Sequence, residues 1–182
     1  MAINPGEQEW LERLFDAYYD KVYAFVYARC GNTARAEDLA SQTFVKIAEN
    51  FRSYRSEKGE LSTWVFTIAL NEMRSFYRRQ KETAALDDAL ELAAPDDIEA
   101  EFLRSEAKNE LLALLSQLDE RSRGVISLKY YGGLSSREIG SILGLSQSNV
   151  GTILSRAIQK LIKFLRPCDE TAFSAYKRQE EE

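Results

Sequence analysis

Apolar side chains recur at three- and four-residue steps along much of the chain, and strict alternation is nearly absent. This spacing predicts amphipathic helices rather than strands. The first apolar stripe comprises Leu11, Leu14, Phe15, Tyr18, Val22, Phe25 and Val26. The second comprises Leu39, Ala40, Thr43, Phe44, Ile47, Ala48 and Phe51. The run Gly31-Asn32-Thr33 separates the two stripes, because glycine ends helices and asparagine or threonine begins them.

A polar loop over residues 52–60 follows the second stripe, with Lys58-Gly59 at its turn. Ser62 is a suitable N-cap for a third helix that runs to about Lys81. We expect these three helices to form one small bundle. Between Glu82 and Pro95 the periodicity fails, and small and acidic residues predict a flexible linker.

Helical periodicity resumes near Ile98 and continues towards the C-terminus. The expected boundaries are Asp119 as a cap, Gly132-Gly133 as a stop, Ser135 with Glu138 as a capping box, Gly144 as a stop, Ser146 as a cap and Pro167 as a stop. The predicted fold is therefore all-α, with two small helical bundles joined by a flexible acidic linker.

Charge is unevenly distributed along the 182 residues, whose net charge is −5. Residues 82–106 hold nine acidic residues and one basic residue, a net charge of −8. Residues 107–166 hold nine basic and four acidic residues, a net charge of +5. A basic module with acidic appendages is typical of a nucleic-acid-binding protein.

Several classes of function are disfavoured. The chain has no histidine, no phosphate-cradling glycine loop and no paired nucleophile and base, so an enzyme is not expected. We also expect no cofactor and no metal site. No apolar stretch reaches the length of a membrane span, and no signal pattern opens the chain, which favours a cytoplasmic protein without membrane insertion. The cysteines Cys30 and Cys168 leave open whether they form a redox switch.

The run from Leu134 to Val150 predicts a helix-turn-helix. Gly140 would let the two helices approach each other, and Gly144 would permit the turn between them. Apolar residues fill the space between the helices: Ile139, Leu143, Leu145, Val150 and Leu154. The second helix directs polar residues outward: Gln147, Ser148, Asn149, Thr152, Ser155 and Arg156, with Lys160 further along. Such side chains can read base edges and phosphates in a major groove.

The third helix of the first bundle is rich in aromatic residues and ends with basic ones, Arg74, Arg78, Arg79 and Lys81. Interleaved rings and cations suit a single-stranded or distorted nucleic acid. Trp64, Ile68 and Met73 are expected in the core instead.

Three motifs resemble those of the bacterial RNA polymerase sigma factors of the extracytoplasmic-function (ECF) subfamily. The first is Ala36-Glu37-Asp38-Leu39-Ala40-Ser41-Gln42-Thr43-Phe44, and the second is Trp64-x-x-x-Ile68-Ala69-x-Asn71 followed by Arg78-Arg79. The third is the helix-turn-helix with Ser146-x-x-Asn149-Val150 and Leu154-x-Arg156-Ala157. The chain departs from many relatives at Ser75, Gly151 and Ile153.

The resemblance implies four parts: sigma region 2 at 7–81, an acidic linker at 82–104, region 4 at 105–166 and an acidic tail at 167–182. Region 2 would bind the β′ clamp helices of core RNA polymerase through Asp38, Gln42, Thr43 and Lys46. It would recognise and melt the −10 promoter element through Tyr54, Arg55, Asn71, Arg74, Arg78 and Arg79. Region 4 would contact the β flap and read the −35 element through its second helix, and the linker would thread a basic polymerase channel. An anti-sigma factor is a partner that relatives commonly have.

Two other readings remain open on the residues alone. One is a dimeric helix-turn-helix repressor whose first module senses a signal, and such a protein should bind operator DNA without polymerase. The other is an enzyme, which the missing catalytic motifs disfavour.

Overall fold

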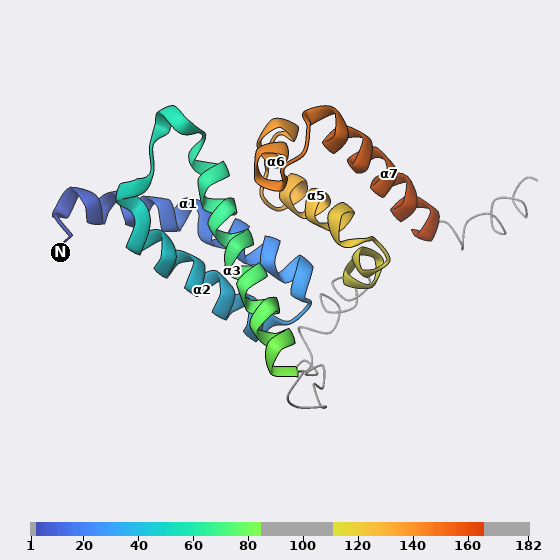
Figure 1. Cartoon of the computed structure of the whole chain (residues 1–182), viewed down its shortest axis with the longest axis horizontal. Coiled ribbons are helices and arrows are strands. Elements are labelled where there is room, and N and C mark those ends of the chain that lie inside the picture. Colours follow the sequence, from blue (N-terminus) through green and yellow to red (C-terminus); the bar gives the residue numbers. More distant parts are fainter. Residues whose placement is uncertain (1–2, 85–110, 166–182) are drawn as a thin grey trace, which may run out of the picture.

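The computed structural model describes residues 3–84 and 111–165. These residues form helices and short connections without any strand, in two groups that lie side by side (Figure 1). The predicted flexible linker and acidic tail fall almost wholly outside the described residues. No helix within the described ranges is long and apolar enough to cross a membrane.

The N-terminal bundle consists of α1 (Pro5–Cys30), α2 (Thr33–Asn50) and α3 (Leu61–Ala84). Helix α1 ends at Gly31, whose left-handed backbone has φ 64°, and the Asn32 side chain caps α2 by accepting the Arg35 N–H. The predicted break between the first two helices is therefore confirmed. The bundle core is apolar and almost fully buried; it includes Val22, Phe25, Val26, Leu39, Ile47, Val65, Phe66 and Met73.

The loop between α2 and α3 contains two short 3-10 turns, Phe51–Ser53 and Ser56–Lys58. The prediction that Ser62 caps the third helix is wrong, because α3 already begins at Leu61. The Ser62 hydroxyl instead donates a hydrogen bond to the Glu138 carboxylate, 76 positions along the chain. A tertiary partner has thus replaced the local role that serine usually takes at a helix start.

The C-terminal bundle consists of α5 (Glu120–Tyr130), α6 (Ser136–Leu143) and α7 (Gln147–Leu165), preceded by a helical segment at 111–116. Asp119 caps α5, and Ser135 with Glu138 forms the predicted capping box of α6. Gly144 has φ 68°, and the Ser146 hydroxyl accepts the Asn149 N–H. The helix-turn-helix and its boundaries are confirmed.

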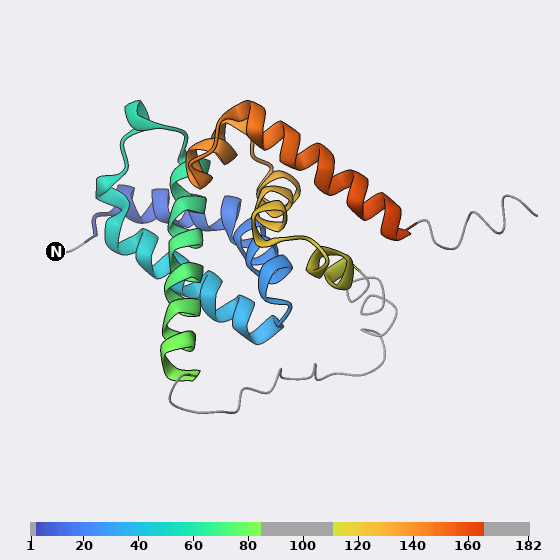
Figure 2. The ribbon, with the colours of Figure 1, turned by 45° about the vertical axis from the view of Figure 1, so that its right-hand side comes forward.

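The two bundles share one hydrophobic core, which the sequence did not predict. Val125, Leu128, Leu134 and Ile139 belong to the same buried cluster as Phe66 of α3 and the inner residues of α1 and α2. Helix α5 packs on α1, and α6 packs on α3 (Figure 2). Gly132 permits this approach, since a Cβ there would lie 3.2 Å from the Phe66 ring. The bundles therefore form a single packed body over the described residues.

Glu7 connects the start of α1 to the loop that follows α2. Its carboxylate accepts the Asn4 N–H in the capping box of α1 and two hydrogen bonds from Arg52, at 2.8 and 2.9 Å. The hydrogen bond from Arg52, then that from Asn4, lowers the pKa of Glu7 from 4.5 to about 2. The ion pair fixes one end of the loop at 51–60 against α1.

We predict that Gly140→Ala destabilises the protein by about 1–3 kcal/mol, as overpacking does. A Cβ at this position would lie 2.5 Å from the Leu145 carbonyl oxygen, and that backbone cannot move without opening the turn. The matched control is Gly151→Ala, because nothing lies within 4 Å of a Cβ there. The control should gain about 0.5–1 kcal/mol from the higher helix propensity of alanine. Urea unfolding measures both, and equal stabilities of the two variants would contradict the close contact.

We predict that Glu7 stabilises the fold in a specific pH range. Its pKa is lower in the folded chain than in the unfolded one, so the stabilisation is present above pH 4.5 and is lost as pH falls towards 2. In Arg52→Ala the pKa of Glu7 should rise towards its usual value, whereas Arg13→Ala on the same helix should leave it unchanged. Carboxyl NMR titration checks this, and a Glu7 pKa that does not rise in Arg52→Ala would show that the ion pair is absent in solution.

Candidate nucleic-acid interface and the cleft between the bundles

Helix α7 presents a polar face away from the rest of the molecule. Its inward residues pack as predicted: Val150 is fully buried, and Ile153 and Leu154 lie against the core. The residues predicted to face outward are all exposed: Gln147, Ser148, Asn149, Thr152, Ser155, Arg156 and Lys160. The structure therefore brings the seven predicted −35 residues together on one exposed surface, which we call the α7 face.

Two members of the α7 face are engaged within the protein. The Thr152 hydroxyl donates to the Ser148 carbonyl at 3.1 Å, a bond within the helix. The Lys160 ammonium donates to the Gln117 carbonyl at 2.6 Å and so ties α7 to the segment before α5. Lys160 thus supports the position of α7, a role that its sequence context did not suggest.

The residues predicted to contact the −10 element lie on α3 and on the loop before it. Asn71, Arg74 and Arg78 are spaced by three and four positions, so they share one exposed face of α3, and Arg79 is exposed beside them. The Tyr54 ring lies between Trp10 and Trp64, with centroid distances of 6.3 and 5.5 Å. The Arg55 guanidinium donates to the carbonyls of Arg52 and Tyr54. Tyr54 and Arg55 therefore lie at the opposite end of α3 from the arginines.

Helix α2 carries the residues predicted to bind polymerase. Asp38, Gln42 and Lys46 form a polar stripe, in which the Gln42 amide donates to the Asp38 carboxylate at 2.8 Å. The Thr43 side chain is 0% exposed, and its hydroxyl donates to the Leu39 carbonyl. Thr43 thus faces the core of the bundle and is absent from the surface of α2.

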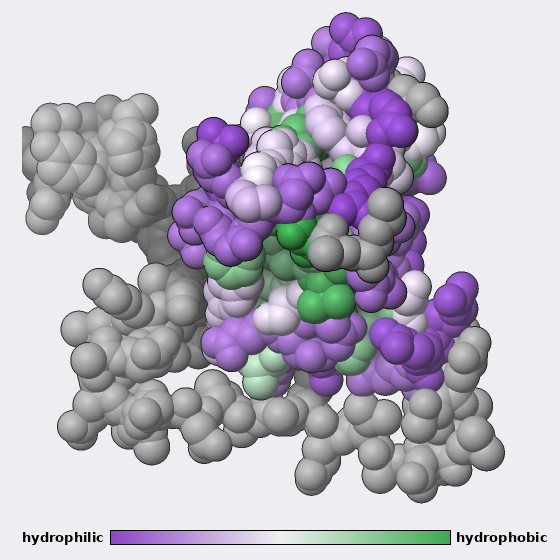
Figure 3. Space-filling view, turned by 90° about the vertical axis from the view of Figure 1, so that its left-hand side faces the viewer, coloured by the Kyte–Doolittle hydropathy of each residue, from purple (hydrophilic) through white to green (hydrophobic). Residues whose placement is uncertain are grey.

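Two apolar side chains near this stripe are exposed, which the sequence pattern did not predict. Val45 is 56% exposed, and Phe15, which was assigned to the buried stripe of α1, is 44% exposed. The Phe15 ring packs edge-on against Phe44 at 4.9 Å. Figure 3 shows the end of the molecule at the left of Figure 1 as largely hydrophilic, with a hydrophobic patch near its centre. Val45 could have been found as an apolar residue outside the helical stripe.

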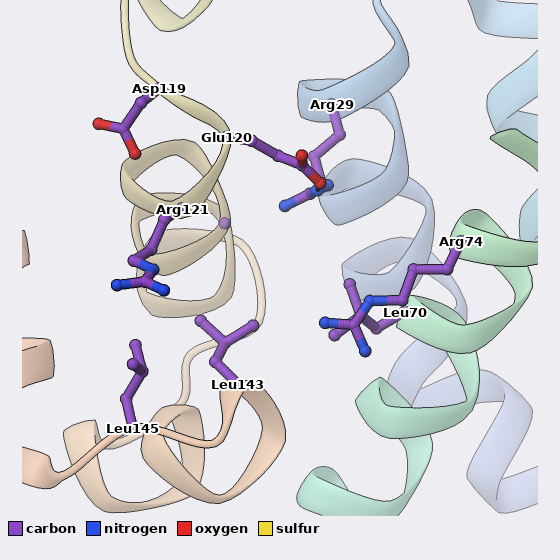
Figure 4. Close-up of a pocket in the computed structure, with 9 residues that line it drawn as sticks. Arg29, Leu70, Arg74, Asp119, Glu120, Arg121, Leu143 and Leu145 are labelled. Atoms are coloured by element: carbon purple, nitrogen blue, oxygen red, sulfur yellow. Dashed lines mark hydrogen bonds and ion pairs between the residues drawn. The ribbon is translucent and has the colours of Figure 1, made fainter. Parts of the chain in front are cut away.

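An arginine-lined cleft lies beside the shared core, where the two bundles meet. Its two adjoining cavities measure about 410 and 440 Å³ and share the walls formed by Arg29, Leu70, Arg74 and Glu120. Arg29 comes from α1, Arg74 from α3 and Arg121 from α5; Figure 4 shows the guanidinium groups of Arg29 and Arg74 in the gap between α5 and the N-terminal bundle, and the Arg121 side chain along α5 towards Leu145. Arg29 and Arg121 were not predicted as site residues, because nothing in the local sequence pattern brings these two residues together.

Arg29 is unusually buried for an arginine, with a side chain only 10% exposed. It reaches α5 because Gly124 leaves room, since a Cβ there would lie 2.8 Å from the guanidinium. Arg29 donates to the Glu120 carboxylate at 3.2 Å, but the Glu120 side chain is 86% exposed. Burial lowers the pKa of Arg29, and the nearby Glu120 only partly counteracts this shift.

Cys30, at the end of α1, donates to the Asn32 carbonyl at 3.4 Å. Burial raises the pKa of this thiol, which disfavours the reactive thiolate. Cys168 lies outside the described residues.

Comparison with known proteins identifies the family to which the chain belongs. Residues 14–83 match sigma-70 region 2, and residues 108–161 match sigma-70 region 4. The chain is 30% identical to the ECF RNA polymerase sigma factor SigW of Bacillus subtilis, over 90% of this chain and 93% of SigW. It is 31% identical to the RNA polymerase sigma factor YlaC of the same organism, over 84% of this chain and 90% of YlaC. It is also 30% identical to the ECF sigma factor BldN of Streptomyces coelicolor, but spans only 62% of that longer protein.

Solved structures of similar chains have the same fold. The structure of CnrH in complex with the cytosolic domain of CnrY matches with a TM-score of 0.67 and 25% identity, over 88% of this chain and 90% of that one. The sigma factor RpoE of Bartonella quintana, in complex with the anti-sigma factor NepR, has the same fold with a TM-score of 0.74 at 21% identity, over 88% of this chain and 99% of that one. The chain belongs to the sigma-70 family of transcription initiation factors, in its extracytoplasmic-function branch.

Proposed function

We propose that this chain acts in the cytoplasm as a non-enzymatic subunit that binds core RNA polymerase and directs it to promoters through region 2 and region 4. The observation that carries the proposal is the α7 face, a set of exposed polar side chains on the second helix of a helix-turn-helix. Val150 and Ile139 are fully buried behind it, so the face is held rigidly. A rigid polar helix of this kind fits the major groove of DNA.

The −35 element is assigned to the α7 face by the chemistry of its side chains. Asn149 and Gln147 carry amides that can pair with adenine, and Arg156 carries the fork that pairs with guanine. Ser146 caps α7 by accepting the Asn149 N–H. The other N–H groups at the start of α7 are proposed to lie near a phosphate at the edge of the DNA major groove, because helix N-termini bind anions. Lys160 is proposed to contact phosphate from the edge of this surface.

The −10 element is assigned to α3 and the loop before it. The exposed face with Asn71, Arg74 and Arg78 offers cations for phosphates, and the Trp10–Tyr54–Trp64 group offers rings beside the loop. Strand separation exposes unstacked bases, which aromatic side chains can receive.

Core polymerase binding is assigned to the polar stripe of α2 with the neighbouring Phe15 and Val45. Exposed apolar side chains rimmed by polar ones are typical of protein–protein contacts. The β′ clamp helices and the β flap are the polymerase surfaces that the family resemblance implies. Thr43 is omitted from this surface because its side chain is buried.

The packed arrangement of the bundles suits the protein away from a promoter. The two promoter elements are centred about 25 base pairs apart, or about 85 Å along the duplex at 3.4 Å per base pair. Helix α1, with 26 residues, is only about 39 Å long at 1.5 Å per residue. Bundles that share one core cannot reach both elements together, so they must separate on the promoter. The sigma factor RpoE of Bartonella quintana was solved in complex with the anti-sigma factor NepR, and an anti-sigma partner that binds the packed form is proposed for this chain.

We predict that Asp38→Arg weakens binding of core polymerase by about tenfold or more, since reversing a charge at an interface introduces repulsion. Asp38 is exposed, and its carboxylate accepts a hydrogen bond from the exposed side of the same helix, so the fold should be preserved. Asp20→Arg, the same substitution at an exposed position of α1 that does not share the helix face of Phe15, is the matched control. Fluorescence titration with core polymerase measures both dissociation constants. Equal affinities for wild type, Asp38→Arg and the control would rule out the α2 stripe as the docking surface.

We predict that substitutions on the α7 face change which promoters are used. A base contact contributes about 1–3 kcal/mol of discrimination, so Asn149→Ala and Arg156→Ala should each relax the preference at one base position. Lys160→Ala should instead weaken binding at all sequences and lower its salt dependence. The measurement is transcription by the holoenzyme from a promoter library randomised at the upstream element. Unaltered preferences in both face variants, with Arg13→Ala as the reference for charge loss elsewhere, would show that α7 does not read sequence.

A further inference from the structure

We propose that the arginine-lined cleft between the bundles binds a phosphoryl group of a small molecule, such as the pyrophosphate portion of a nucleotide. Arg29, Arg74 and Arg121 come from three different helices and line this cleft. Guanidinium groups bind phosphate oxygens in paired hydrogen bonds, and several that converge from different directions fit a group with oxygens on all sides.

The charges around the cleft leave a positive excess. Four arginines line the two cavities, with Arg123 beside the three named above, and the facing carboxylates are those of Asp119 and Glu120. Asp119 accepts the backbone N–H and the hydroxyl of Ser122 and is thus occupied. Arg123 donates to the carbonyls of Leu115, Ser116 and Leu118 and is occupied as well.

Of the remaining arginines, Arg29 has one carboxylate partner, and Arg74 and Arg121 have none in the part of the chain that the structure describes. Glu120 accepts one hydrogen bond from Arg29, but the Arg29 Nε is buried without a partner. The guanidinium groups of Arg74 and Arg121 have no ion pair or hydrogen bond among the described residues. The Arg29 Nε has almost no accessible surface, so an oxyanion in the cleft would be bound by the other guanidinium nitrogens of Arg29 and by those of Arg74 and Arg121.

The other walls indicate what the phosphoryl group is attached to. Leu70, Leu143 and Leu145 line the first cavity, and Met73 and Tyr77 line the second. Cavities of about 410 and 440 Å³ are within the size range of small-molecule sites. Apolar and aromatic surface next to the arginines suits the organic part of a phosphorylated metabolite rather than inorganic phosphate alone.

Binding in this cleft would couple to the arrangement of the bundles. Arg29 and Arg74 belong to the N-terminal bundle, and Arg121 belongs to the C-terminal one. A ligand held by all three binds only the packed form and stabilises it by mass action. This inference does not rest on the proposed function, because binding can be measured on the isolated chain.

Binding of sodium pyrophosphate and of ADP to the full chain tests the proposal, by isothermal titration calorimetry at 0.15 M salt. We expect saturable one-to-one binding of at least one probe. Arg121→Ala should weaken it at least tenfold, and Arg121→Lys should weaken it less because the charge remains. Arg121 is exposed, so its loss should leave the fold intact, and Arg13→Ala on the outer side of α1 is the matched control with unchanged affinity.

NMR of the arginine Nε–H groups provides the site-specific readout. The resonances of Arg29, Arg74 and Arg121 should shift together as pyrophosphate or ADP is added, while that of Arg13 stays in place. Absence of binding for both probes would overturn the proposal. Equal binding of the probe to wild type and to Arg121→Ala would overturn it too. The proposal would also fail if sodium chloride, at the same ionic strength as the probe, displaced the probe as well as unlabelled probe does.

Discussion

Helix α3 is buried on two sides, and the arrangement of the whole molecule depends on this double packing. Phe66 packs edge-on against Phe25 of α1 at 5.5 Å and also contacts the turn around Gly132 that follows α5. A single helix therefore belongs to both bundles. Glu138 adds a polar connection at the same place, because one carboxylate accepts hydrogen bonds from the Ser135 N–H that starts α6 and from the Ser62 hydroxyl of α3. Closing the capping box and joining the bundles are thus coupled.

Local chemistry explains which parts of the fold could be predicted. Asn32, Asp119 and Ser135 cap helices through contacts with residues three positions away, and Gly31 and Gly144 take left-handed backbone at helix ends, so short stretches of sequence suffice. The shared core could not be found in this way. The apolar positions of α3 that meet the second bundle have the same periodicity as those that meet the first, and periodicity does not identify the partner surface.

The candidate site likewise has one part that the sequence predicts and one part that it does not. The α7 face was predictable because helical spacing alone separates Val150 from Asn149 and Thr152. The cleft was not, since Arg29 and Arg121 meet only after the bundles pack. Arg74 connects the two cases: its spacing to Asn71 places it on the surface proposed for the −10 element, whereas in the packed form it lines the cleft. Arg74 is thus both exposed on α3 and part of the cleft wall in the packed form.

Gly151 has a consequence for how such a protein diverges. It lies in the first turns of α7, is exposed, and has open space where a side chain would be. Because glycine is a poor residue for a helix interior, almost any replacement would be tolerated or would favour the helix. A longer polar side chain there would extend the surface proposed to read the −35 element without disturbing Val150 behind it. After gene duplication, a copy could acquire a new set of target genes by one substitution at this position, while its scaffold and its polymerase contacts stay under unchanged selection.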